Sequence, residues 1–133
     1  MKHISTELSE QHKELIKIIK KQDKFEDAIK IFLDIHSQLH SNTVSKEKAN
    51  LINPLISDLK SDEYRIMPSK DDETIVWALW HITRIEDLTM NVLIADENQI
   101  FNNDWKLKMN VNVSDTGNAM TDDEIMKLSK DMC

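Results

Sequence analysis

Glycine, proline and cysteine are nearly absent from this chain. Its 133 residues include one glycine, two prolines and one cysteine. Turns favour glycine and proline, and an all-β protein of this size would need many turns. The composition therefore favours helices joined by polar loops. The single cysteine, Cys133, cannot form an internal disulfide, which makes the cytoplasm the default compartment.

A basic face and a long apolar run are also lacking. The net charge is −7, and Lys and Arg form no stripe that could neutralise the phosphates of a nucleic acid. We therefore expect no nucleic-acid partner. The uninterrupted apolar runs are too short to span a membrane, and residues 1–10 lack the apolar segment of a signal peptide. With 40% hydrophobic and 31% charged residues, the chain is expected to form one globular domain over residues 1–133.

Apolar periodicity predicts helices along most of the chain. The strongest runs from Asp72 to Ala95, and its apolar residues cover more than half the circumference, as in a helix buried at the centre of a bundle. Ile100, Phe101 and Trp105 are expected to pack the otherwise irregular residues 96–120 onto it. The other predicted helices are Thr6–Lys21, a helix capped by Asp23 that runs to Val44, a short one from Pro54 to about Tyr64, and a last one opened by the capping box Thr121–Glu124.

Two features of this helix pattern leave alternatives open. The break between the first two helices is weak, so they could instead form one bent helix. The last helix has room for only about three turns before Cys133. We therefore expect that the chain is shortened relative to its relatives, or that this helix completes a partner.

Two histidines have the spacing of a metal-chelating pair. His36 and His40 are four residues apart, so on a helix they lie on one face, about 6 Å apart along the axis. Two imidazoles at this spacing can bind one divalent ion. They also share an apolar stripe with Phe25, Ile29 and Phe32, where an imidazole without a partner costs desolvation energy. The alternative is ordinary hydrogen bonding at a bundle edge. His12, among charged residues, is expected to be solvated.

His81 is the third candidate ligand, because it lies on the strongest predicted helix. Three histidines with an open position would suit zinc, nickel or iron. Arg84, Glu86 and Asp87 follow within two turns. Glu86 or Asp87 could orient a ligand's free N–H or act as a general base. The alternative is that Arg84 pairs with an acid and His81 is a core histidine.

The stretches "LHSNTVS" and "WALWHITRIEDLTMNVLI" resemble the DinB-like family of bacterial helical proteins. The likeness rests on Trp80-His81, Arg84, Glu86-Asp87 and Asn91, with "DIHSQLH" as the matching earlier segment. It implies an all-α, up-down four-helix bundle of the DinB/YfiT type, often dimeric, with a divalent metal held by three histidines. His81 matches the family's histidine in the helix that reads "WH". The family's other two ligands form a pair on a later helix, and no histidine follows His81 here. His36 and His40 would supply that pair, or the site is incomplete.

These observations support two hypotheses about function. In the first, the chain is a divalent-metal-dependent hydrolase or a thiol-dependent transferase, and the resemblance implies thiol-dependent transferases or isomerases for some relatives. In the second, it is a non-catalytic helical-bundle protein for binding or stress response, with structural histidines. A homodimer is expected as its main interaction, and a small-molecule ligand is compatible with either hypothesis.

Overall fold

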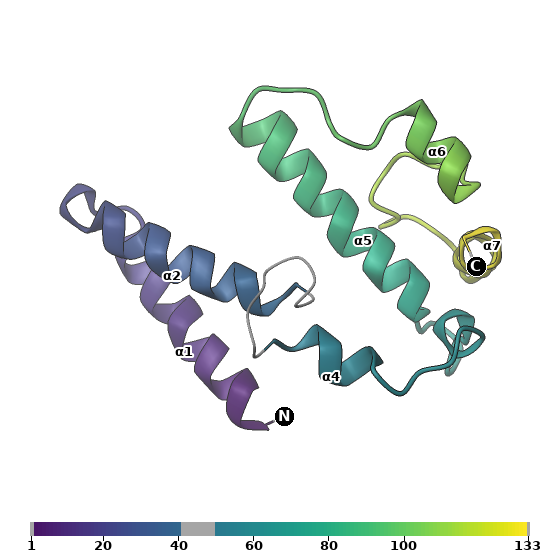
Figure 1. Ribbon diagram of the computed structural model, residues 1–133, viewed down its shortest axis with the longest axis horizontal. Coiled ribbons are helices and arrows are strands. Elements are labelled where there is room, and N and C mark those ends of the chain that lie inside the picture. Colours follow the sequence, from purple (N-terminus) through teal and green to yellow (C-terminus); the bar gives the residue numbers. More distant parts are fainter. Residues whose placement is uncertain (1, 41–49, 133) are drawn as a thin grey trace. The chain divides into compact units, whose positions relative to one another are not determined.

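The computed structural model describes residues 2–40 and 50–132. All regular structure in these ranges is helical, which confirms the all-α prediction. Two 3₁₀ turns, η1 (Gln22–Lys24) and η2 (Glu63–Arg65), and one π-helix, η3 (Leu88–Ile94), accompany the α-helices. The α-helices are α1 (Lys2–Ile18), α2 (Phe25–Gln38), α4 (Ile52–Ile56), α5 (Ile75–Asp87), α6 (Asn103–Met109) and α7 (Asp122–Asp131) (Figure 1).

The chain divides into two compact units, residues 1–58 and residues 59–133. The prediction of a single domain over residues 1–133 stays a prediction.

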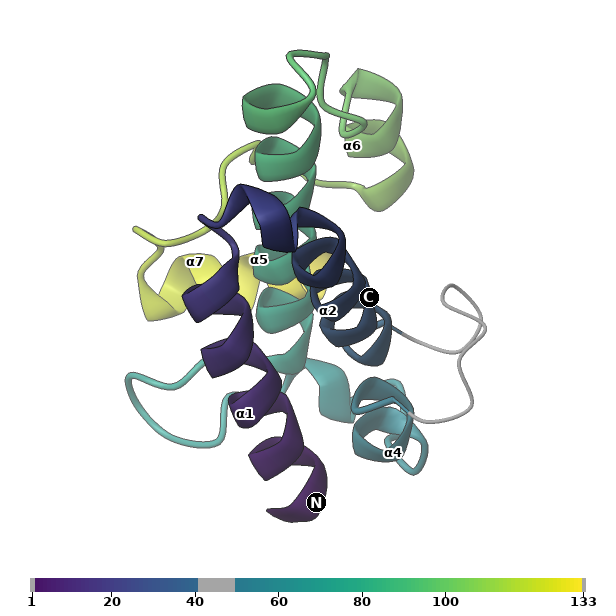
Figure 2. The same cartoon turned by 90° about the vertical axis from the view of Figure 1, so that its left-hand side faces the viewer.

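The first unit is built on a hairpin of α1 and α2, which lie side by side (Figures 1 and 2). The short connection through η1 turns the chain back, as expected for antiparallel helices. Leu15, Ile18 and Ala28 are buried between the two helices. Apolar side chains of α2 pack against these three: Ile31, Phe32 and Ile35.

The observed boundaries of this hairpin correct several predictions. η1 separates the two helices, so the single bent helix is wrong. Asp23 lies within η1 and does not cap α2, whose preceding residue, Lys24, makes no side-chain capping bond. α1 starts before the predicted Thr6 and ends three residues before the predicted Lys21. α2 ends at Gln38, and the predicted end at Val44 lies outside the described residues.

The predicted helix from Pro54 to Tyr64 is much shorter in the structure. α4 holds only five residues, with Pro54 at its third position. It begins at Ile52, and just before it the Asn50 side chain accepts a hydrogen bond from the Asn53 backbone N–H at 2.8 Å. It ends early because the polar residues that follow favour turns over a helix. Tyr64 lies in η2 instead.

In the second unit, α5 begins at a buried cap. The hydroxyl of Thr74 accepts a hydrogen bond from Trp77 N at 3.0 Å and contacts the Ser129 hydroxyl of α7 at 2.6 Å. α7 contacts α5 and lies across its direction in Figure 2, while Figure 1 shows α7 end-on beside α5. The helix continues through η3 to Ile94, close to the predicted end at Ala95. The four-helix up-down order of the whole chain stays a prediction.

Within the second unit, the buried residues of α5 form one stripe. The stripe consists of Val76, Trp80, Arg84 and Asp87, which follow one another at helical spacing. Some apolar residues off this stripe are exposed in this unit, such as Ile82 at 52%, and burial of α5 on most sides stays a prediction. Two of the buried positions are charged, and sequence periodicity counts charged residues as surface.

Residues 96–120 are less irregular than predicted, because they contain α6. Asn102 caps its start by accepting from the backbone N–H groups of Asp104 and Trp105, and Asn110 ends it in the left-handed conformation that asparagine tolerates. Phe101 is buried and meets Trp80 edge-to-face at 5.1 Å, as expected for packing onto α5.

Two neighbours of Phe101 do not pack as predicted. Ile100 and Trp105 are 63% and 43% exposed. The capping box of the last helix, in contrast, is confirmed: Thr121 and Glu124 exchange the two predicted bonds at the start of α7. No helix among the described residues has the length and apolar character needed to cross a membrane.

The hairpin core can be tested with two neighbouring substitutions. Leu15→Ala removes a buried side chain and should lower the free energy of unfolding by about 2–4 kcal/mol. Ile16→Ala is the matched control, since Ile16 is 60% exposed, and should change it by less than about 1 kcal/mol. Urea unfolding followed by circular dichroism measures both. Equal effects would contradict the packing of α1 against α2.

Candidate functional site

His36 and His40 form a close pair at the end of α2. Their Nε2 atoms lie 3.0 Å apart. The rings are tilted by 52° with centroids 4.3 Å apart, and Phe32 stacks on His36 from the preceding turn at 5.9 Å. Both histidines are half-buried. The structure thus confirms that the two imidazoles share one face and aim corresponding nitrogens at one point.

The distance between these nitrogens fits one shared metal ion. A zinc–imidazole bond is about 2.0–2.1 Å long, so two such bonds at angles between 90° and the tetrahedral value separate the nitrogens by about 2.9–3.4 Å. The observed 3.0 Å lies within that interval. The same distance also suits a hydrogen bond from a protonated Nε2 to a bare one.

The position of the pair on α2 favours a cation. His36 lies in the last turn of the helix and His40 just beyond it. The carbonyl groups at a helix C-terminus carry partial negative charge, which stabilises a positive ion placed there. The pair therefore combines two nitrogen ligands with a favourable electrostatic environment.

His81 lies on α5 in the second unit, and its ring is fixed from two sides. Trp77 stacks on the ring with the planes 9° apart and the centroids 4.6 Å apart. Nδ1 lies 2.7 Å from the carbonyl oxygen of Thr116. Because a carbonyl only accepts, Nδ1 carries the proton. In the neutral ring the lone pair is then on Nε2, and this arrangement is the usual one for a metal-binding histidine.

Residues 114–117, which precede α7, run antiparallel to α5. Their backbone carbonyl oxygens accept hydrogen bonds from three side chains of α5. Trp77 Nε1 donates to Gly117 O at 3.3 Å, His81 to Thr116 O, and Arg84 to Ser114 O at 2.8 Å. Gly117 has φ +83° and a Cβ there would lie 2.8 Å from Trp77 Nε1, so only glycine fits. Trp77, His81 and Arg84 each meet a carbonyl oxygen of this segment, which accounts for their spacing in the stretch "WALWHITR".

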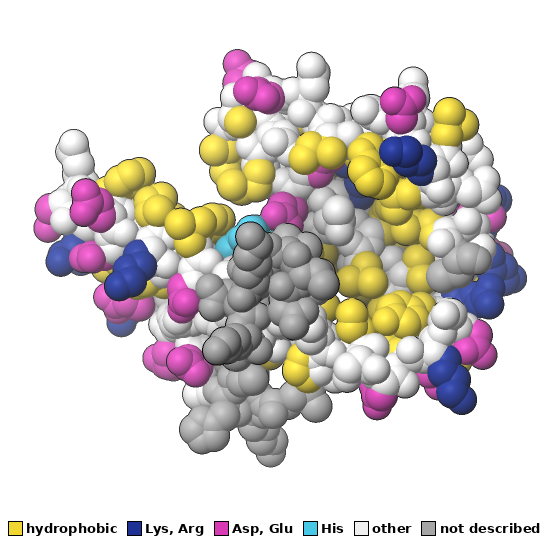
Figure 3. Space-filling model, viewed as in Figure 1, with side chains coloured by type: hydrophobic (Ala, Val, Ile, Leu, Met, Phe, Trp, Pro, Cys, Tyr) yellow, Lys and Arg dark blue, Asp and Glu magenta, His cyan; other side chains and the backbone are white. Residues whose placement is uncertain are grey.

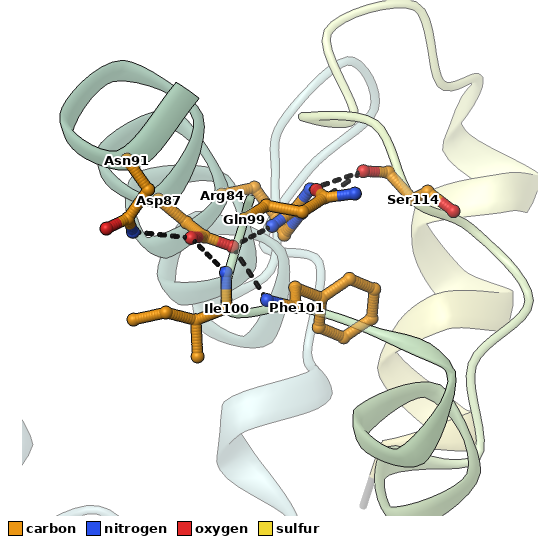
Figure 4. Close-up of polar contacts among 7 residues, drawn as sticks. All are labelled: Arg84, Asp87, Asn91, Gln99, Ile100, Phe101 and Ser114. Atoms are coloured by element: carbon orange, nitrogen blue, oxygen red, sulfur yellow. Dashed lines mark hydrogen bonds and ion pairs between the residues drawn. The ribbon is translucent and has the colours of Figure 1, made fainter. Parts of the chain in front are cut away.

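Arg84 and Asp87 form the buried centre of this unit (Figure 4). The Arg84 guanidinium, 2% exposed, donates to Asp87 Oδ2, to Gln99 Oε1 and twice to Ser114 O. It also lies over the Phe101 ring, 4.6 Å from the centroid. The part of the alternative in which Arg84 pairs with an acid is confirmed.

The Asp87 carboxylate accepts four hydrogen bonds. Oδ1 accepts from Asn91 Nδ2 and Ile100 N, and Oδ2 accepts from Phe101 N and Arg84. Burial alone would raise the pKa of Asp87, but the backbone donors, Asn91 and the Arg84 charge outweigh it and lower that pKa. A carboxylate with four donors is a structural anchor, and it makes a poor general base.

The structure separates the predicted site residues into two groups. His36 and His40 belong to the first unit, and His81, Arg84, Glu86 and Asp87 belong to the second. Within the second unit, Arg84 holds Ser114, two residues before the carbonyl that accepts from His81, and so positions that histidine indirectly. The three-histidine set and a direct contact of Glu86 or Asp87 with a ligand stay predictions.

Sequence reasoning did not identify the partners of these residues. Gln99, Ser114 and Thr116 lie in polar loops without periodicity, and two of them act through backbone carbonyls, which any residue type provides. The only signal was Gly117, the single glycine of the chain, which marks the close approach of this segment to α5.

Comparison with known proteins gives no match to a family model, to a curated protein or to a solved structure. The DinB-like resemblance therefore stays a prediction.

Asp87→Asn tests the buried centre. It replaces an acceptor of four hydrogen bonds by a group that also donates, and leaves Arg84 without its counter-ion, so the free energy of unfolding at pH 7 should fall by about 3 kcal/mol. Glu97→Gln, which neutralises an exposed carboxylate nearby, is the control and should have little effect.

The pH dependence of the free energy of unfolding provides a second test of Asp87. Because the folded pKa of Asp87 is below its ordinary value of 3.8, its stabilising contribution is present above that pH and is lost as the pH falls through the folded pKa. The difference between wild type and Asp87→Asn should therefore shrink below about pH 4. Urea unfolding at a series of pH values measures it, and a difference independent of pH would contradict the assignment.

Proposed function

We propose that this protein binds a divalent transition-metal ion, with His36 and His40 as a chelating pair and His81 as a third ligand. The observation that supports it most is the 3.0 Å separation of the two Nε2 atoms at the negative end of α2. Zinc, nickel and iron are the ions that suit imidazole ligands. The DinB-like resemblance of the same residues supports the proposed metal site. We propose the up-down four-helix bundle on the same resemblance.

His81 is proposed as a ligand because its tautomer suits that role. The bond from Nδ1 to Thr116 O keeps the proton off Nε2, and the stacked Trp77 limits rotation of the ring. A ligand that is already oriented loses less conformational freedom on binding. Arg84 and Asp87 contribute by holding the segment that contains this carbonyl.

Three histidines leave a coordination position for water or substrate. A divalent ion bound there would act as a Lewis acid and lower the pKa of a bound water or thiol. The reaction class that we propose is therefore hydrolysis or thiol-dependent group transfer. Asp87 is already saturated with hydrogen bonds, so a general base in this unit would have to be Glu86, which is half-buried.

The rival proposal is a non-catalytic helical protein with structural histidines, acting as a homodimer. The hydrogen bond that the same 3.0 Å distance permits between His36 and His40 favours it. Only the first proposal requires that both Nε2 lone pairs bind an ion. The metal content of the protein therefore distinguishes the two proposals.

Metal content separates these proposals. Untagged wild type, loaded with zinc and desalted, should contain about one ion per chain by plasma mass spectrometry. His36→Ala and His40→Ala should each lower the content at least about tenfold, because a single imidazole is a weak site. His81→Ala should weaken zinc binding and confirm the third ligand. His12→Ala is the matched control, since His12 is exposed on α1, and should leave the content unchanged.

Two results would overturn the metal proposal. One is a folded wild type that takes up no zinc, nickel or iron. The other is metal retained at equal stoichiometry in both His36→Ala and His40→Ala. Circular dichroism of every variant excludes unfolding as the cause of a loss. Acidification should release the ion, because protons compete for imidazole nitrogens.

A further inference from the structure

The second unit contains a pocket of about 510 Å³ that the metal proposal does not use. All of its lining residues belong to this unit. Its size is typical of small-molecule sites, which measure about 300–1,000 Å³. Hydrophobic side chains gather over α5 and α6 in Figure 3. The pocket wall includes three aromatic residues and three methionines: Trp80, Phe101, Trp105, Met90, Met109 and Met132.

The methionines make this wall adaptable. A methionine side chain is unbranched and polarisable, so it adjusts to ligands of different shape and makes favourable contacts with aromatic rings. Aromatic side chains supply large apolar surfaces for stacking. The pocket therefore suits a compact apolar or aromatic molecule.

The charges around the pocket exclude an anionic ligand. Arg84 lines it, but Asp87, Gln99 and Ser114 accept four hydrogen bonds from its guanidinium. Asp87 neutralises that cation, and Glu86 adds a further negative charge to the lining. Lys108 lies 4.9 Å from the Trp105 ring centroid but does not line the pocket. A carboxylate or phosphate would therefore find no available cation in the wall.

We infer that this pocket binds a neutral, mainly apolar small molecule. Its apolar body lies between Trp105 and the methionines. The inference is independent of the metal proposal, since none of the three histidines lines the pocket.

Fluorescent probes of matched shape test the ligand class on the full chain. Prodan is a neutral naphthalene with a ketone acceptor, and anilinonaphthalene sulfonate is an aromatic probe of similar size with a negative charge. Prodan should bind saturably with a blue-shifted emission, and the sulfonate should bind at least about tenfold more weakly.

One substitution and one matched control locate the site. Trp105→Ala removes part of the wall and should weaken prodan binding about tenfold. Leu107→Ala is the control, since Leu107 belongs to the same helix, is 81% exposed and does not line this pocket. It should leave the affinity unchanged.

Three outcomes would overturn the inference. These are the absence of saturable prodan binding, equal affinities for Trp105→Ala and Leu107→Ala, and sulfonate binding as tight as that of prodan.

Discussion

The second unit depends on the buried ion pair of Arg84 and Asp87. Asp87 binds the backbone N–H groups of Ile100 and Phe101, and Arg84 binds the carbonyl oxygen of Ser114. One pair on α5 therefore fixes the segments on both sides of α6. An uncompensated charge at either position would be strongly destabilising. Removing one partner thus affects the loops as well as the helix.

This constraint links the fold to the proposed function. The segment that Arg84 holds also provides the Thr116 carbonyl, which sets the tautomer of His81. Phe101, which Asp87 holds through its backbone, lines the apolar pocket. The ion pair of Arg84 and Asp87 therefore helps to position both the proposed metal ligand His81 and the wall of the apolar pocket. On the first unit, the hairpin of α1 and α2 supports the His36–His40 pair.

The sequence predicted what depends on local periodicity and missed what depends on distant partners. The i, i+4 spacing of His36 and His40 correctly placed both on one face, and the capping box at Thr121 correctly located α7. α6 was missed because its signals are the asparagines before and after it, which also occur in loops. The apolar residues of α5 did not reveal its buried stripe, because two of the four buried positions are the charged residues Arg84 and Asp87. Acceptors such as the Thr116 carbonyl have no sequence signature at all.

The central claim is that His36 and His40 share one metal ion through their Nε2 atoms. X-ray absorption spectroscopy of zinc-loaded, untagged protein tests it most directly, because it counts imidazole ligands around the ion. The claim predicts at least two imidazole nitrogens at about 2.0–2.1 Å from zinc, and fewer in His40→Ala. A zinc ion with oxygen ligands only, or the same spectrum in wild type and His40→Ala, would contradict it.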